Sequence, residues 1–110
     1  MLRALPTLAA TVALMLLSVD AQAKSARCFT TDDGEYDCDF VSTDSDGSFE
    51  VSAPGKPKFS LVISEPGVGF LFGDYNDGTG NIALPGRYLR SESDPACWAN
   101  EDTQVELCAW

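Results

Sequence analysis

The chain has 110 residues, with 17 Asp and Glu against 7 Lys and Arg, no His, and a formal net charge of −10. This length suits one small domain rather than two. The acidic surplus excludes the basic footprint that nucleic-acid binding requires, and it disfavours docking on an anionic membrane surface. Without His, no Ser–His or Cys–His catalytic pair and no His-containing metal site can form.

The first 23 residues have the pattern of a secretory signal. Arg3 gives a positive start, residues 8–19 form an apolar run, and Ala21-Gln22-Ala23 supplies a small-x-small cleavage site. We therefore expect residues 1–23 to be a cleaved signal peptide. Residues 24–110 then form one exported domain, periplasmic or secreted, whose mature chain does not insert into a membrane.

Four Cys fall within the expected mature chain, and an even number in a short exported protein predicts two disulfides. They are Cys28, Cys38, Cys97 and Cys108. Four Cys allow three connectivities, and hairpin geometry favours the pairs Cys28–Cys38 and Cys97–Cys108. A three-residue loop at 32–34, with Gly34 left-handed, would place the first pair directly opposite each other, and a four-residue loop at 101–104 would do the same for the second. The alternative of a zinc site lacks both C-x2–4-C spacing and a His.

From residue 27 onward the chain alternates short strand-like runs with turn dipeptides such as Asp33-Gly34 and Pro85-Gly86. No long segment has helical periodicity. The predicted strands are Arg27–Thr31, Glu35–Thr43, Ser48–Ala53, Lys58–Ser64, Val68–Gly73, Asn81–Leu84, Arg87–Arg90, Ala96–Ala99 and Val105–Trp110. The fold class is therefore all-β, a small antiparallel barrel or sandwich of about seven to nine short strands stapled by two disulfides.

Side-chain alternation predicts which face of each strand is buried. In the second strand Tyr36, Cys38 and Phe40 lie on one face, and Glu35, Asp37 and Asp39 lie on the other. The expected core joins the Cys38 face to the apolar residues of the next strands, which are Phe49, Val51, Phe59, Leu61, Ile63, Phe70 and Phe72.

The most polarised stretch, residues 32–50, holds eight acidic residues and no basic one. One interpretation is a solvated face that keeps the protein soluble. The other is a docking face for a cationic partner, with Glu35, Asp37 and Asp39 as candidate binding residues, because a field of one sign steers association.

Two segments, 44–50 and 74–81, resemble calcium loops because oxygen-bearing side chains precede a Gly. Their Gly comes at position four or five instead of six, and no Glu closes the loop at position twelve. Since Asp-Gly is also a common turn dipeptide, we interpret both segments as turns and predict no metal and no cofactor.

The sequence offers no motif for catalysis, so the protein is not expected to be an enzyme. Arg87, Tyr88 and Trp98 are of the residue types that dominate binding hot spots, and they are further candidates for partner binding. The competing interpretation buries Tyr88 and Trp98 in the core and pairs Arg87 and Arg90 with nearby acids.

Two short motifs, Tyr36-Asp37-Cys38 and Gly86-Arg87-Tyr88, resemble features of the bacterial periplasmic inhibitors of C-type lysozyme. Those inhibitors are exported acidic β-barrels of similar size. Their Ser-Gly-x-x-Tyr loop is replaced here, with Leu84 and Pro85 at its first two positions, so the resemblance assigns no functional residue to this chain.

Together these observations predict a non-catalytic interaction module. A finer hypothesis is that the protein inhibits a basic protein. The resemblance implies a lysozyme-inhibitor-like role. The alternative is an envelope component that binds a small ligand, a glycan or calcium.

Overall fold

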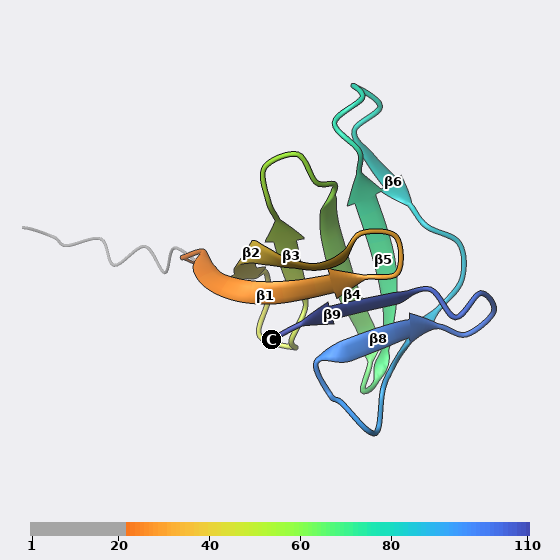
Figure 1. The fold of residues 1–110 in the computed structure, drawn as a ribbon. Helices are drawn as coiled ribbons and strands as arrows, with labels where there is room; N and C mark the ends of the chain where they lie inside the picture. Colours follow the sequence, from red (N-terminus) through yellow and green to blue (C-terminus); the bar gives the residue numbers. More distant parts are fainter. Residues whose placement is uncertain (1–21) are drawn as a thin grey trace, which may run out of the picture.

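The structure is a computed structural model that describes residues 22–110, so the expected signal peptide lies almost entirely outside the described residues. Within residues 22–110 nine strands follow one another without a helix, as the sequence predicted, and each lies within a few residues of its expected position (Figure 1). They are β1 (Lys24–Thr30), β2 (Gly34–Ser42), β3 (Phe49–Ser52), β4 (Lys58–Glu65), β5 (Val68–Asp74), β6 (Asn81–Ala83), β7 (Tyr88–Arg90), β8 (Cys97–Asn100) and β9 (Glu106–Ala109). Residues 22–110 contain no helix long and apolar enough to span a membrane.

The strands form a closed antiparallel barrel, which decides between the two predicted architectures. Eight strands are hydrogen-bonded in the order β4-β3-β2-β1-β9-β8-β7-β5, and pairing between β4 and β5 closes the ring. The short strand β6 pairs with the upper part of β5 and remains outside the ring. Closure removes the free edges of the eight strands, which would otherwise be open to pairing with another chain.

The interior is filled by inward side chains from all eight barrel strands. Trp98, Leu61, Leu107, Val51 and Cys28 are the largest fully buried apolar ones. The complete buried cluster is Cys28, Cys38, Phe49, Val51, Phe59, Leu61, Leu71, Tyr88, Trp98 and Leu107. On β2 the alternation is as predicted, with Cys38 buried and Glu35, Asp37 and Asp39 exposed.

The predicted burial of Phe70 and Phe72 on β5 is wrong. Phe70 is 41% exposed on the outside of the barrel, and the inward positions of β5 are Gly69, Leu71 and Gly73. Leu71 is paired with the buried Leu61, and a Cβ at residue 69 would lie 3.2 Å from Leu61 Cγ. Glycine at position 69 therefore leaves room for Leu61, and the phenylalanines of β5 lie on its outward face.

Both disulfides have the predicted partners, Cys28–Cys38 and Cys97–Cys108. Cys97 and Cys108 are directly opposite each other on β8 and β9, as expected. The predicted register of the first hairpin is wrong, because Cys28 is opposite Tyr36 and Cys38 is opposite Ala26. The shift is two residues, which leaves every side chain on its face, so the diagonal cysteines still bridge with 5.9 Å between their Cα atoms.

The turn of the first hairpin explains this shift. Thr30 Oγ1 accepts a hydrogen bond from the Asp33 backbone N–H at 3.1 Å, and Thr30 pairs with Gly34. Gly34 has a φ of +71°, the left-handed conformation predicted for it. The reversal is thus centred on Asp32 rather than on Asp33.

Candidate functional site

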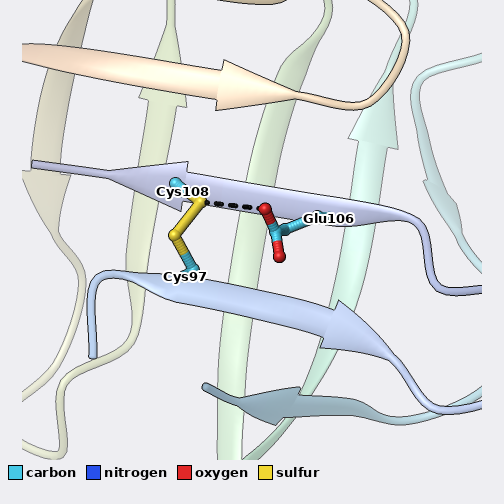
Figure 2. Close-up of side chains that lie close together, drawn as sticks. All are labelled: Cys97, Glu106 and Cys108. Carbon is cyan, nitrogen blue, oxygen red and sulfur yellow. Dashed lines mark hydrogen bonds between the residues drawn. A yellow bond between two sulfur atoms is a disulfide. The ribbon is translucent and has the colours of Figure 1, made fainter. Parts of the chain in front are cut away.

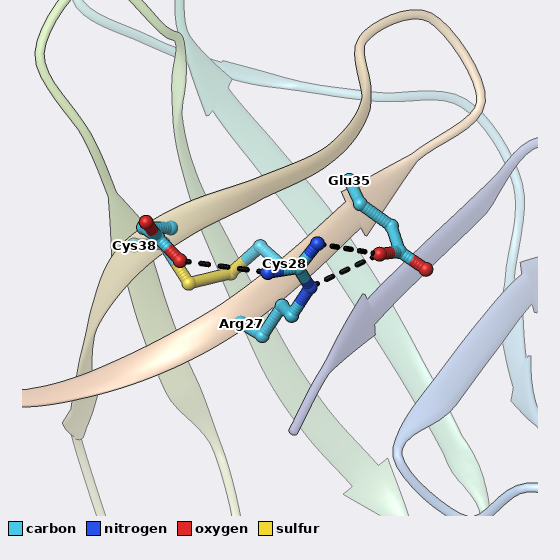
Figure 3. Close-up of polar contacts among 5 residues, drawn as sticks. Arg27, Cys28, Glu35 and Cys38 are labelled. Atoms are coloured by element: carbon cyan, nitrogen blue, oxygen red, sulfur yellow. Dashed lines mark hydrogen bonds and ion pairs between the residues drawn. A yellow bond between two sulfur atoms is a disulfide. The ribbon is translucent and has the colours of Figure 1, made fainter.

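The outward carboxylates of β2 form what we call the acidic strand face, defined as Glu35, Asp37 and Asp39. Arg27 of β1 lies among them, because the observed register pairs Arg27 with Asp37. Its Nε and Nη2 donate to Glu35 Oε2 at 3.0 and 2.8 Å, and Nη1 lies 3.8 Å from Asp37 Oδ1 (Figure 3). These contacts raise the pKa of the Arg27 guanidinium, chiefly through the Glu35 hydrogen bonds. Only Asp39 of the three has no ion-pair partner in the part of the chain described.

Two lysines that lie outside residues 32–50 in the sequence also approach this acidic stretch. Lys56 Nζ lies 3.6 Å from Asp33 Oδ1, and Lys58 Nζ lies 3.3 Å from Glu50 Oε2. Residues 32–50 contain no base, but three bases from elsewhere in the sequence form ion pairs with them. Since all these pairs are partly solvated, each adds little to stability, and their main effect is on the local charge.

The candidates of the C-terminal half are not gathered on one surface. Tyr88 and Trp98 are buried in the barrel, and the Arg90 guanidinium lies 4.8 Å from the centre of the Trp98 ring. Arg87 is exposed and donates to both carboxylate oxygens of Glu101 at 3.1 and 2.7 Å. Tyr88 and Trp98 are therefore core residues, and Arg87 forms an ion pair.

The two loops that resemble calcium sites use their carboxylates to close their own turns. Asp44 Oδ1 accepts the backbone N–H groups of Asp46 and Ser48 at 2.8 and 3.0 Å. The Ser48 side chain is the largest cause of the lowered pKa of Asp44, and these backbone groups lower it further. Asp74 Oδ1 accepts from the Asn76 N–H in the same way, and Asp77 from Thr79. These contacts match the turn interpretation of both segments.

Cys97, Glu106 and Cys108 are the one group of three potential metal ligands that lie together among residues 22–110 (Figure 2). The two sulfurs are bonded to each other, so neither is a thiolate that a metal could bind. Glu106 Oε1 lies 3.6 Å from Cys108 Sγ. This contact is not a hydrogen bond, because an oxidised sulfur carries no proton. It does place the Glu106 carboxylate on the outer face of β9.

Acidic side chains gather at one end of the barrel. We call it the open end, and it is formed by the loops 31–33, 53–57, 75–80, 84–87 and 101–105. Its acids are Asp32, Asp33, Asp74, Asp77, Glu101, Asp102 and Glu106, and its bases are Lys56 and Arg87. Both bases are engaged, with Asp33 and Glu101 respectively, so five carboxylates there have no ion-pair partner among residues 22–110.

A cavity of about 50 Å³ lies at this end, and we call it the end pocket. Its floor consists of inward side chains from five strands, namely Thr30, Phe59, Leu71, Tyr88 and Leu107. Tyr75, Val105 and Asp32 stand at its rim, and Tyr75 is 43% exposed with its ring edge-on to Phe59. The volume is too small for a drug-sized ligand, but it admits a few waters or the end of one side chain.

Asn100, which the sequence did not single out, organises the loops around this pocket. Its buried amide Nδ2 donates to Pro85 O at 2.8 Å, and its Oδ1 accepts the N–H groups of Asp102 and Thr103 at 2.9 and 3.0 Å. A Cβ at Gly86 would lie 3.0 Å from this amide nitrogen, so residue 86 must be small. The only sequence signal was an Asn directly after a predicted strand, a residue type that is common in turns.

All three tyrosines have a raised pKa, with burial as the largest cause in each. The folded state therefore holds the phenolic protons more tightly than the unfolded state, whose pKa is about 10. We expect these groups to leave the free energy of unfolding unchanged below about pH 10 and to lower it as the pH rises further. Absorbance of phenolate should titrate at higher pH in the folded protein than in urea. Equal midpoints would contradict the raised pKa of the tyrosines.

Comparison of the chain with models of known protein families, with curated protein sequences and with solved structures finds no match. The class of molecule is defined by the fold alone. It is a small closed β-barrel with two disulfides, which indicate an oxidising compartment of extracellular type.

Proposed function

We propose that this protein is a non-catalytic, exported interaction module that binds a positively charged protein. The observation that carries this proposal is the number of carboxylates that the protein leaves unpaired. Residues 22–110 contain sixteen Asp and Glu, and five of them have a Lys or Arg nitrogen within 4.0 Å. Eleven carboxylates therefore keep their charge without an ion-pair partner in that part of the chain.

An excess of this kind raises the rate at which a cationic partner is captured. The field of exposed charges extends about 8 Å at physiological salt, so neighbouring carboxylates act together on an approaching protein. Such attraction speeds association much more than it slows dissociation. The closed barrel with its two disulfides supplies a rigid support, which lowers the conformational cost of binding.

A C-type lysozyme is the first partner to test, since it is basic and since Tyr36-Asp37-Cys38 and Gly86-Arg87-Tyr88 resemble motifs of lysozyme inhibitors. Binding should be measured by surface plasmon resonance at two salt concentrations, with a panel of other basic proteins and of acidic proteins of similar size. We expect a basic protein to bind with an association rate that falls steeply as salt rises. Failure of every basic protein to bind, or binding that is insensitive to salt, would overturn the proposal.

The acidic strand face provides a more local test. The variant E35Q/D37N/D39N removes three charges with little change in side-chain volume and frees Arg27, so the face becomes net positive. We expect the association rate with the basic partner to fall several-fold, while far-ultraviolet circular dichroism stays unchanged because the three residues are exposed.

The matched control is the variant D46N/E65Q/E92Q. It makes the same change in net charge away from the acidic strand face, at the end of the barrel opposite the open end. None of these three acids is in an ion pair among the described residues. An equal loss of rate in both variants would mean that the partner senses only the overall charge and that the acidic strand face has no special role.

A further inference from the structure

A shallow hollow lies on the outer surface of the barrel beside the Cys97–Cys108 disulfide, and we call it the outer hollow. It has a volume of about 290 Å³, and its walls include Phe29, Trp110 and the disulfide. Trp110 is 50% exposed, and its indole Nε1 donates to Asp94 Oδ2 at 3.0 Å, which holds the ring at the edge of the hollow. The hollow therefore offers an aromatic surface that is open to solvent and fixed in orientation.

Two carboxylates, those of Asp94 and Glu106, line the same hollow. Both residues are half-buried, and neither has a Lys or Arg nitrogen within 4.0 Å among residues 22–110. The Glu106 carboxylate lies beside the disulfide, with Oε1 3.6 Å from Cys108 Sγ, and no N–H or O–H group of the described chain donates to it (Figure 2). Glu106 thus presents a charge whose hydrogen bonds a binding partner can supply.

The outer hollow adjoins the acidic strand face. Phe29 of β1 is opposite Cys108 of β9 on one side and opposite Glu35 of β2 on the other, so the hollow and the acidic strand face share one outer surface of the barrel. Arg27 is opposite Trp110, to which it is joined by backbone hydrogen bonds of 3.1 and 2.8 Å. Its guanidinium is bound to carboxylates of the acidic strand face, so it leaves the charge of the hollow unpaired. A cation attracted by the acidic strand face therefore arrives next to the hollow.

An arginine side chain has the chemistry that complements these walls. Its planar guanidinium stacks on aromatic faces and donates two parallel hydrogen bonds to one carboxylate, and Trp110 and Glu106 supply one partner of each kind. A lysine ammonium is a compact, strongly hydrated charge that cannot make this double contact, and an anion is repelled by Glu106 and Asp94. The volume lies just below the range of small-molecule sites, about 300–1,000 Å³, and suits one long side chain.

We propose that the outer hollow is the docking point for an arginine side chain of the basic partner, with the guanidinium stacked on Trp110 and paired with Glu106. Because the hollow is shallow and its walls carry the carboxylates, the charged group stays beside them and in contact with solvent. The proposal rests on the proposed function, since it names the chemical group of the basic partner that the protein receives. It places the contact beside the outer disulfide, whereas the acidic strand face contributes attraction at a distance.

The test is a titration of the oxidised protein with a capped Gly-Gly-Arg-Gly-Gly peptide, followed by ¹H–¹⁵N NMR spectra. We expect weak, about millimolar, saturable binding, with shifts concentrated at the backbone of Phe29, Ser93 and Cys108 and at the indole N–H of Trp110. The same peptide with citrulline, which keeps the planar shape without the charge, should show no saturable binding, and the lysine peptide should bind more weakly. The variants E106Q and W110A should each weaken binding about two- to five-fold, the range of one solvated charge contact and of one exposed cation–π contact.

The matched control is E92Q. Glu92 is exposed in the loop beside the hollow and does not line it, so this variant makes the same charge change as E106Q without removing a contact. It should leave the affinity for the peptide nearly unchanged. The NMR spectrum of each variant reports whether it is folded, and the indole signal of Trp110 in the wild-type protein reports the stacking contact independently of W110A.

Equal weakening by E92Q and E106Q, or equal binding of the arginine and citrulline peptides, would overturn the proposed site. So would equal binding of the lysine peptide, or an indole signal of Trp110 that does not shift. Salt-dependent binding of a basic protein that neither E106Q nor W110A weakens would overturn the site while supporting the proposed function. Binding of the arginine peptide at the outer hollow without binding of any basic protein would support the site and overturn the proposed function.

Discussion

Replacing Trp98 with alanine is expected to lower the free energy of unfolding by about 3–5 kcal/mol, the range for removing a large aromatic side chain from a core. Trp98 is only 1% exposed and is the largest fully buried side chain of the described chain. It lies between Arg90 and Leu107 on the neighbouring strands, so its removal leaves a cavity at the centre of the ring. A domain of this size has a total stability of about 4–13 kcal/mol, so the loss is a large fraction of the whole.

Trp110 provides the matched control because it is the second of the two tryptophans in the chain. It is 50% exposed, and its indole Nε1 donates to Asp94 Oδ2 at 3.0 Å. W110A should cost about 1 kcal/mol, the net contribution of one hydrogen bond. Urea unfolding followed by circular dichroism measures both variants. A loss from W98A no greater than that from W110A would contradict the central position of Trp98.

The second large effect is expected from the two disulfides, which should not be equivalent. Both pairs are buried, but Cys28 and Cys38 point into the barrel and belong to its central cluster, whereas Cys97 and Cys108 bridge β8 and β9 on the outer face of the ring. Their sequence separations are 10 and 11, so the loss of chain constraint is nearly the same for both, about 2–4 kcal/mol. C28A/C38A should cost about 1–2 kcal/mol more than C97A/C108A, because it leaves a cavity inside the closed ring, whereas the half-exposed Trp110 beside the outer pair can move into the space that C97A/C108A leaves.

Unfolding of the two double variants in urea, with the oxidised wild-type protein as reference, measures this difference. Each variant keeps the other disulfide, so the comparison isolates the position of the missing one. A greater loss of stability from C97A/C108A would mean that the outer disulfide, which contacts Phe29 and Trp110 in the same surface hollow, is the more important one for folding.

Phe70 shows why the core could be predicted only in part. Both alternating sets of side chains on β5 contain apolar residues, so period-two alternation alone cannot tell the inner set from the outer one. The choice is made by β4, where Leu61 needs Gly69 beside it. The same closure leaves Val62, Phe70 and Leu89 exposed on the outside of the barrel, although each belongs to a predicted strand.

The acidic strand face shows the same limit for the site. Glu35, Asp37 and Asp39 share the outward face that the alternation of β2 predicted. Arg27 forms ion pairs with Glu35 and Asp37 only. Which carboxylates it reaches depends on the register of the hairpin, and the observed register differs from the predicted one by two residues. The end pocket has no local signal at all, because its walls come from five strands that only ring closure brings together.

The sequence by itself determined the features that depend on near neighbours in the chain. The nine strands, the turns between them and both cysteine pairs follow from side-chain alternation, left-handed glycines and the lengths of two hairpin loops. The tertiary structure alone decided the register of the first hairpin, the buried face of β5, the ion pairs of the acidic surface and the end pocket. These features depend on contacts between strands distant in sequence, and their geometry is set by closure of the barrel rather than by any local preference of the chain.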